Sequence, residues 1–138
     1  MGFTGIEHFA FAARSPEGLA DWYCRAMGFR IYTTFNNGEG KPKSYMIYLG
    51  TNQPMVEIVP ADRERPMREK PNTEPGLVHV AISVDDFDAA VKTLASHGAR
   101  PEGDERVAPN GTRVRFFRDP EGNLFHILFR TEPLAESK

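Results

Sequence analysis

An internal repeat constrains the fold of this chain more than any other feature of its sequence. Residues 5–14 predict a strand rich in aromatic and apolar residues, and residues 15–27 predict an amphipathic helix that ends at Gly28. Residues 76–84 predict another such strand, and a second amphipathic helix follows it and ends at Gly98. Glycine is the usual residue just past a helix C-terminus, so both helices end in the same way. The chain therefore begins the same pattern twice.

Three more strands are predicted after each helix, at residues 29–37, 43–50, 54–59, 99–108, 111–119 and 123–130. Asn-Gly and related turn sequences separate several of these strands. We expect an α+β protein whose single domain spans residues 1–138 and holds two tandem βαβββ modules. The predicted boundaries are about 5–60 for module one, 61–75 for a proline-rich linker, about 76–130 for module two and 131–138 for a tail. Each module is too small to bury a good core alone, so the two should pack together.

The composition indicates a soluble protein and says little about chemistry. Hydrophobic residues make up 40% of the chain and charged residues 26%, and the net charge is −2. A weakly acidic chain with interspersed charges has no positive field for nucleic acid, and no apolar run reaches the roughly 18 residues of a membrane span. The N-terminus shows no secretory signal, and the single cysteine, Cys24, has no partner for an internal disulfide. We expect a cytoplasmic protein that binds neither nucleic acid nor membrane.

The repeat extends to single residues that can bind a metal. His8 and His79 lie on the first predicted strand of each half, and the last strand of each half carries one polar residue in an apolar run, Glu57 or His126. Glu57 follows His8 by 49 residues, and His126 follows His79 by 47. This agreement indicates two pairs of residues in equivalent places.

Each of the four residues also has a simpler interpretation. A histidine in an apolar strand is often an ordinary core or edge residue, whereas a carboxylate such as Glu57 must be solvated, paired or bound to a metal. Together, three imidazoles and one carboxylate suit Zn, Ni, Co, Fe or Mn and suit calcium or magnesium poorly. The set His8, Glu57, His79 and His126 therefore predicts one divalent transition metal.

Two arginines are candidates for binding a substrate. Arg113 and Arg115 alternate with Val114 and Phe116 on a predicted strand, so both arginines point to one face. If that face lines a site, either guanidinium could pair with a carboxylate or phosphate. The alternative is a solvated strand edge.

The sequence resembles the vicinal-oxygen-chelate superfamily, which includes glyoxalase I, methylmalonyl-CoA epimerase, extradiol dioxygenases and the fosfomycin and bleomycin resistance proteins. The resemblance covers about residues 5–130 and is carried by IEHFAFAA, ADWYCRAMGFR, VEIV, GLVHVAISVDDFDAAV and DPEGNLFHI. It implies that the two modules form an open, U-shaped, eight-stranded barrel around one metal site. It also implies that the ligands come from the first and fourth strands of each module, at His8, Glu57, His79 and His126. In glyoxalase I and the epimerase a glutamate occupies the position of His126, so this chain departs from those two enzymes there.

The resemblance implies a glyoxalase-like lyase or isomerase acting on a small substrate with two adjacent oxygens. The metal would then stabilise the enediolate formed when a neighbouring carbon loses its proton, with Glu57 as the first candidate base and His126 as the second. Two other activities fit the same superfamily: an Fe(II) dioxygenase of the extradiol type, and a drug-binding or ligand-binding resistance protein without turnover. Superfamily members commonly form homodimers, and we expect one here.

Overall fold

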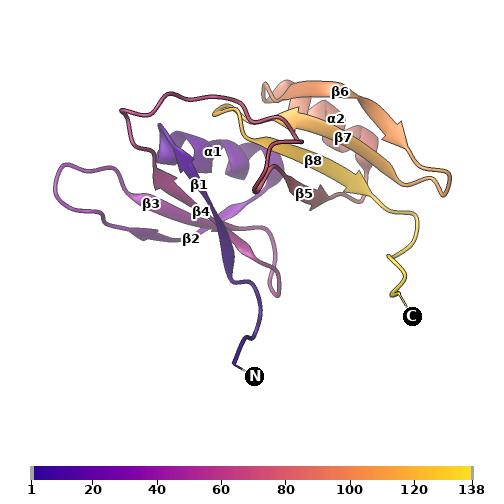
Figure 1. Cartoon of the computed structure of the whole chain (residues 1–138), viewed down its shortest axis with the longest axis horizontal. Helices are drawn as coiled ribbons and strands as arrows, with labels where there is room; N and C mark the ends of the chain where they lie inside the picture. The colour runs from indigo at the N-terminus through magenta and orange to yellow at the C-terminus, as the bar shows by residue number, and fades with distance from the viewer. Residues whose placement is uncertain (1, 138) are drawn as a thin grey trace. The chain divides into compact units, whose positions relative to one another are not determined.

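The chain forms two compact units that divide between Met67 and Arg68. The computed structural model describes residues 2–137. Within this range the first unit contains β1 (His8–Ala13), α1 (Pro16–Met27), β2 (Arg30–Phe35), β3 (Ser44–Tyr48) and β4 (Met55–Pro60). The second contains β5 (Val80–Ser83), α2 (Phe87–Ser96), β6 (Arg100–Val107), β7 (Arg113–Arg118) and β8 (Leu124–Phe129), as Figure 1 shows. The predicted α+β class with two βαβββ modules is confirmed.

The two units share one sheet topology. The strand order is β1-β4-β3-β2 in the first unit and β5-β8-β7-β6 in the second. The first and last strands of each unit pair in parallel, and the remaining neighbours pair antiparallel. Parallel neighbours need a long crossover connection, which the helix and the two middle strands supply here. The first strand of each unit is therefore an edge strand beside the last one.

In the first unit, α1 covers one face of the sheet. The Ser15 hydroxyl caps the helix by accepting a hydrogen bond from the Gly18 N–H, and Gly28 ends the helix in the left-handed conformation at φ 80°. The apolar side of α1 includes the buried Leu19, and the helix contacts β3 and β4. Because side chains alternate along a strand, the buried Ile58 and the polar Glu57 lie on opposite faces of β4.

The second unit repeats this arrangement with different side chains. The Asp86 carboxylate caps α2 by accepting from the Ala89 N–H, and Gly98 follows the helix at φ 76°. The rings of Phe117 and Phe125 stack with their centroids 5.8 Å apart on neighbouring strands. These contacts give the sheet one apolar face and leave the alternate residues of β7 and β8 on the other.

The first strand of the second unit begins later than the sequence predicts. The strand expected at 76–84 begins at Val80, so His79 lies one residue before it. Val80 pairs with Phe125, the second residue of β8, which begins at Leu124. Almost no residue of β8 is therefore left to pair with the chain before Val80. Residues 61–79 hold neither helix nor strand, and the unit boundary falls inside the predicted linker.

Within residues 2–137, no helix is long and apolar enough to cross a membrane. The predicted shared barrel concerns the relation between the two units and stays a prediction.

The packing of the first unit predicts a contrast between two isoleucines. Ile58 is 0% exposed and Ile31, on the outer strand β2, is 50% exposed. Ile58→Ala should lower the free energy of unfolding by about 3 kcal/mol because it leaves a cavity. Ile31→Ala should lower it by less than about 1 kcal/mol. Urea denaturation followed by circular dichroism measures both, and equal losses would contradict this description of the core.

Candidate metal centre

The first unit places His8 beside Glu57. Glu57 pairs with Ala10 across the parallel β1–β4 ladder, and His8 lies two residues before Ala10 on the same face of β1. The His8 Nε2 atom is 4.0 Å from Glu57 Oε1. The other ring nitrogen of His8, Nδ1, is 3.1 Å from the Glu7 carboxylate. A proton on Nδ1, donated to Glu7, leaves the Nε2 lone pair directed toward Glu57.

The second unit repeats this register with an imidazole in place of the carboxylate. His126 pairs with Ala81 across the parallel β5–β8 ladder, and His79 lies two residues before Ala81. The ring centroids of His79 and His126 are 4.7 Å apart. Phe116 contacts both rings, with centroid distances of 5.3 Å to His79 and 4.9 Å to His126. Each unit thus has an opening histidine, His8 at the start of β1 or His79 just before β5. This histidine lies beside the candidate metal ligand of the last strand.

His126 is held in the neutral form that binds metals. Burial, reinforced by the nearby charges of His79 and Arg130, lowers the pKa of His126 to about 4. Its Nδ1 atom is buried and has no hydrogen-bond partner among the described residues. A neutral imidazole whose buried nitrogen has no hydrogen-bond partner fits the role of a metal ligand.

The donor set fits a transition metal, and the spacing within each pair is close to what one ion requires. Two donors about 2.1 Å from one ion lie about 3.0 to 3.4 Å apart, so a small side-chain rotation would bring His8 and Glu57 into range. Within residues 2–137, no group of three or more His, Cys, Asp or Glu side chains is placed to hold an ion. The candidate ligands form two pairs, one per unit, and their union in a four-ligand site stays a prediction.

The two predicted substrate-binding arginines lie away from the histidine pair. Because Phe116 pairs with His126, the residues that alternate with Phe116, namely Arg113 and Arg115, point to the opposite face of β7. The Arg113 guanidinium lies over the Phe87 ring of α2 at 4.3 Å from its centroid. Substrate binding by Arg113 and Arg115 stays a prediction, but the structure does not bring these side chains beside His79 and His126.

Arg113 instead joins α2 to β6. Its guanidinium donates to both oxygens of Glu105, at 2.8 and 2.9 Å, and to Asp88 at 2.9 Å. Hydrogen bonding to Arg113 holds the pKa of each carboxyl below its usual value. This arginine already has two anionic partners within the protein.

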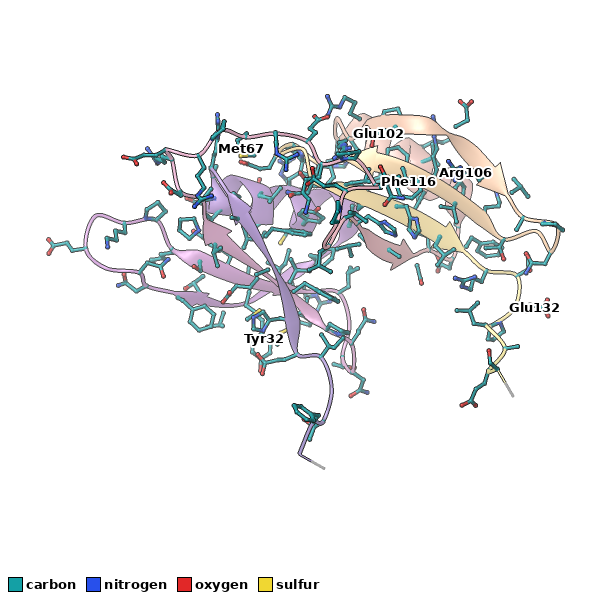
Figure 2. The ribbon with its side chains drawn as sticks, viewed as in Figure 1. Tyr32, Met67, Glu102, Arg106, Phe116 and Glu132 are labelled. Carbon is teal, nitrogen blue, oxygen red and sulfur yellow. The ribbon has the colours of Figure 1, made fainter. Side chains whose placement is uncertain are left out.

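Sequence reasoning missed a different arginine, Arg106. Arg106 pairs with Val114 and Glu102 with Phe116, and Phe116 pairs with His126, so the register places Arg106 and Glu102 on the face of the sheet that carries His126. Figure 2 labels Glu102, Arg106 and Phe116. Arg106 is exposed and forms no ion pair with any residue between 2 and 137. The bulge between Glu102 and Arg106 sets this orientation, and nothing in the sequence predicted the pairing that follows it.

Two βαβββ units of the same topology, each with an equivalent pair of metal-competent residues, define a class of proteins with tandem βαβββ modules. The chain belongs to the Glyoxalase/Bleomycin resistance protein/Dioxygenase superfamily, whose family profile matches residues 5–127. The recognised superfamily resemblance is thereby confirmed.

Individual relatives agree with this assignment. The chain is 33% identical over 126 residues to the uncharacterized protein YaeR of Escherichia coli (strain K12), covering 88% of this chain and 93% of that protein. A glyoxalase family protein from Enterococcus faecalis has a similar structure, with a TM-score of 0.73 and 26% identity over 93% of this chain and 99% of that one. TnmS3, an antibiotic binding protein from Streptomyces sp. CB03234, matches with a TM-score of 0.70 and 20% identity over 95% of this chain and 99% of that one. Relatives of this fold thus include a binding protein.

The Arg113 contacts predict a pH-dependent contribution to stability. The folded-state pKa values of Asp88 and Glu105 are lowered, so the stabilisation is present above the usual carboxyl pKa of about 4 and is lost as the pH falls through the folded values. Arg113→Met should therefore reduce stability at neutral pH, and this effect should be smaller at an acidic pH well below about 4. Urea unfolding at both pH values measures this difference. Arg25→Met, at the exposed Arg25–Asp21 pair, serves as the control and should change stability little at either pH.

Proposed function

We propose that this protein binds one divalent transition metal through His8, Glu57, His79 and His126 and acts as a glyoxalase-like lyase or isomerase. The substrate is a small molecule with two adjacent oxygens. The observation that supports this proposal is the common register of the two units. Glu57 pairs with the residue two positions after His8, and His126 pairs with the residue two positions after His79. The same register in both units pairs equivalent positions of the repeat.

The metal, when bound, supplies Lewis-acid stabilisation of the negative charge that develops on the substrate oxygens. Its identity lies among Zn, Ni, Co, Fe and Mn, because the donors are nitrogen atoms and one carboxylate.

Glu57 is the residue that removes the substrate proton. Its carboxylate projects from the face of β4 opposite the buried Ile58 and is 22% exposed, so it can rotate between His8 and a substrate. His126 is the weaker candidate because its ring lies against both His79 and Phe116. A base needs freedom to reach the carbon whose proton it takes, and Glu57 has more of it.

Arg106 is a cation that could bind an anionic group of the substrate. It shares the face of His126 and has no carboxylate partner within residues 2–137, whereas Arg113 is already paired with Glu105 and Asp88. A guanidinium without a carboxylate partner can donate hydrogen bonds to a carboxylate or phosphate without breaking an existing pair. We infer that the substrate carries such a group.

Ligand binding without turnover is the second candidate function. The similarity of fold to TnmS3, an antibiotic binding protein, favours it. In this case the exposed face around His79 and His126 would contact an organic ligand directly. Metal content separates the two candidates.

The metal site predicts a stoichiometry that one histidine controls. Untagged protein purified without chelators should contain about one equivalent of a transition metal by elemental mass spectrometry, and His126→Ala should lower this content at least about tenfold because it removes a ligand. His97→Ala is the matched control: His97 lies at the end of α2, and its Nδ1 donates to the Thr93 carbonyl. Wild-type protein that binds no metal even after reconstitution would exclude the enzyme proposal and favour ligand binding.

The role of Glu57 predicts a loss of turnover. Glu57→Gln keeps the size of the side chain but removes its basicity, so kcat should fall about 10²-fold to 10⁴-fold with the substrate that a screen of 2-oxoaldehydes and acyl-CoA epimers returns. Glu39→Gln, in the exposed turn between β2 and β3, should leave kcat unchanged. Turnover by Glu57→Gln at the wild-type rate would remove Glu57 as the base.

A further inference from the structure

The second unit contains a side chain directed at His79 from outside the sheet. Asn72 Oδ1 lies 2.6 Å from His79 Nδ1. A carbonyl oxygen only accepts hydrogen bonds, so Nδ1 carries the proton and donates it. In the Nδ1–H tautomer the lone pair lies on Nε2. Asn72 thus selects one tautomer of His79 and fixes the plane of its ring.

The segment that carries Asn72 is folded, although its composition resembles that of a linker. The Glu74 N–H donates to the Pro71 carbonyl and closes a turn with Asn72 and Thr73 at its tip. The Arg68 guanidinium donates to both oxygens of Glu74, at 2.6 and 3.0 Å. Bidentate pairs of this kind hold geometry as well as charge.

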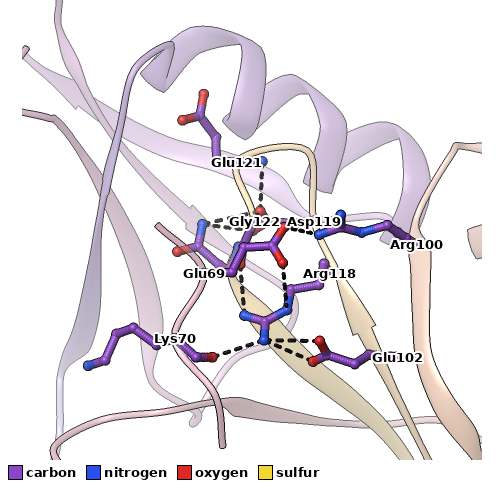
Figure 3. Close-up of polar contacts among 9 residues, drawn as sticks. Glu69, Lys70, Arg100, Glu102, Arg118, Asp119, Glu121 and Gly122 are labelled. Carbon is purple, nitrogen blue, oxygen red and sulfur yellow. Dashed lines mark hydrogen bonds and ion pairs between the residues drawn. The ribbon is translucent and has the colours of Figure 1, made fainter. Parts of the chain in front are cut away.

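A buried arginine ties the same segment to the sheet (Figure 3). Arg118 is 4% exposed, and its guanidinium donates to the Lys70 carbonyl at 2.9 Å and to the Gly122 carbonyl at 3.1 Å. The same guanidinium pairs with Glu102 at 2.9 Å. Arg118 therefore anchors the residue just before the Asn72 turn to β7. β7 is the neighbour of β8, the strand that carries His126.

Glu69 adds a second attachment next to the first. Its carboxylate forms an ion pair with Arg100 and lies 3.8 Å from the Arg118 Nε atom. Gly122 permits this approach, since a Cβ at that position would lie 3.2 Å from the Glu69 side chain. Hydrogen bonding to Arg100 lowers the pKa of Glu69, so this carboxylate is charged at neutral pH.

We propose that Asn72 is a positioning residue that holds His79 as the Nδ1–H tautomer with Nε2 free to bind the metal, and that the Arg118-anchored segment 68–74 keeps Asn72 in place. The metal-binding half of this inference rests on the proposed function, whereas the tautomer half does not. The first unit uses a neighbouring residue for the same purpose, since Glu7 lies beside His8 Nδ1. Asn72 is a neutral acceptor, so it orients His79 without adding negative charge. Hydrogen-bond acceptors that orient a metal ligand in this way raise the affinity of the site for its metal.

Nitrogen-15 NMR of metal-free protein tests the tautomer directly. With histidine labelled in both ring nitrogens and the sample at about pH 8.5, where imidazoles are neutral, long-range correlation spectra should show His79 as the Nδ1–H form in the wild type. His79→Gln identifies the resonances. Asn72→Ala should move His79 toward the Nε2–H form, Asn72→Asp should keep Nδ1–H, and Thr73→Ala in the same turn should change nothing. An Nε2–H wild type, or no shift in Asn72→Ala, would overturn the proposal.

Metal affinity supplies the second readout. In competition with a chromophoric chelator, Asn72→Ala should bind Zn²⁺ about 10-fold to 100-fold more weakly than the wild type, and Asn72→Asp should restore the affinity. Equal affinity in Asn72→Ala, with one equivalent bound by the wild type, would defeat the positioning role alone. A wild type that shows the Nδ1–H tautomer but binds no Zn²⁺ would instead defeat the proposed function and leave the orientation of His79 by Asn72 intact.

Discussion

The parallel pairing of the first and last strands in each unit is the interaction on which the candidate site depends. This pairing brings together residues that are far apart in the chain, and its register decides which of them meet. In both units the opening histidine lies two residues before the strand neighbour of the second donor, Glu57 or His126. A shift of one residue would send one member of each pair to the helix side of its sheet. The meeting of the candidate ligands therefore depends on backbone hydrogen bonds more than on any local motif.

The repeat and most of its elements could be predicted from the sequence because they depend on local patterns. Gly28 and Gly98 mark the ends of the two helices, and both adopt the positive φ that glycine permits. The paired positions of the candidate ligands could also be inferred, since equivalent spacing in two repeats implies equivalent places. The start of β5 could not, because Val80 begins that strand only through the position of Phe125 on a strand 45 residues later.

The face on which a side chain lies was predictable only in part. Alternation correctly places Arg113 and Arg115 on the same face, but the sequence does not tell which face that is. The answer comes from the pairing of Phe116 with His126, which assigns the arginines to the α2 side. Asn72 was missed for a related reason. Its segment looks like a solvated linker by composition, and only the contact of Arg118 with Lys70, 48 residues earlier in the chain, shows that it is anchored.

The large separation between partners has a consequence for the order in which this protein is made. His8 leaves the ribosome 49 residues before Glu57, and His79 leaves 47 residues before His126. Each first strand must then remain an unpaired edge until the helix and two further strands have been synthesised, because only the last strand closes the sheet over it. Contacts of this range carry a loop-closure cost that local hairpins do not, so the parallel ladder is expected to form late in the folding of each unit. A nascent chain thus exposes a lone histidine before the candidate ligand pair of that unit can form, and the pair forms only once the last strand has been added.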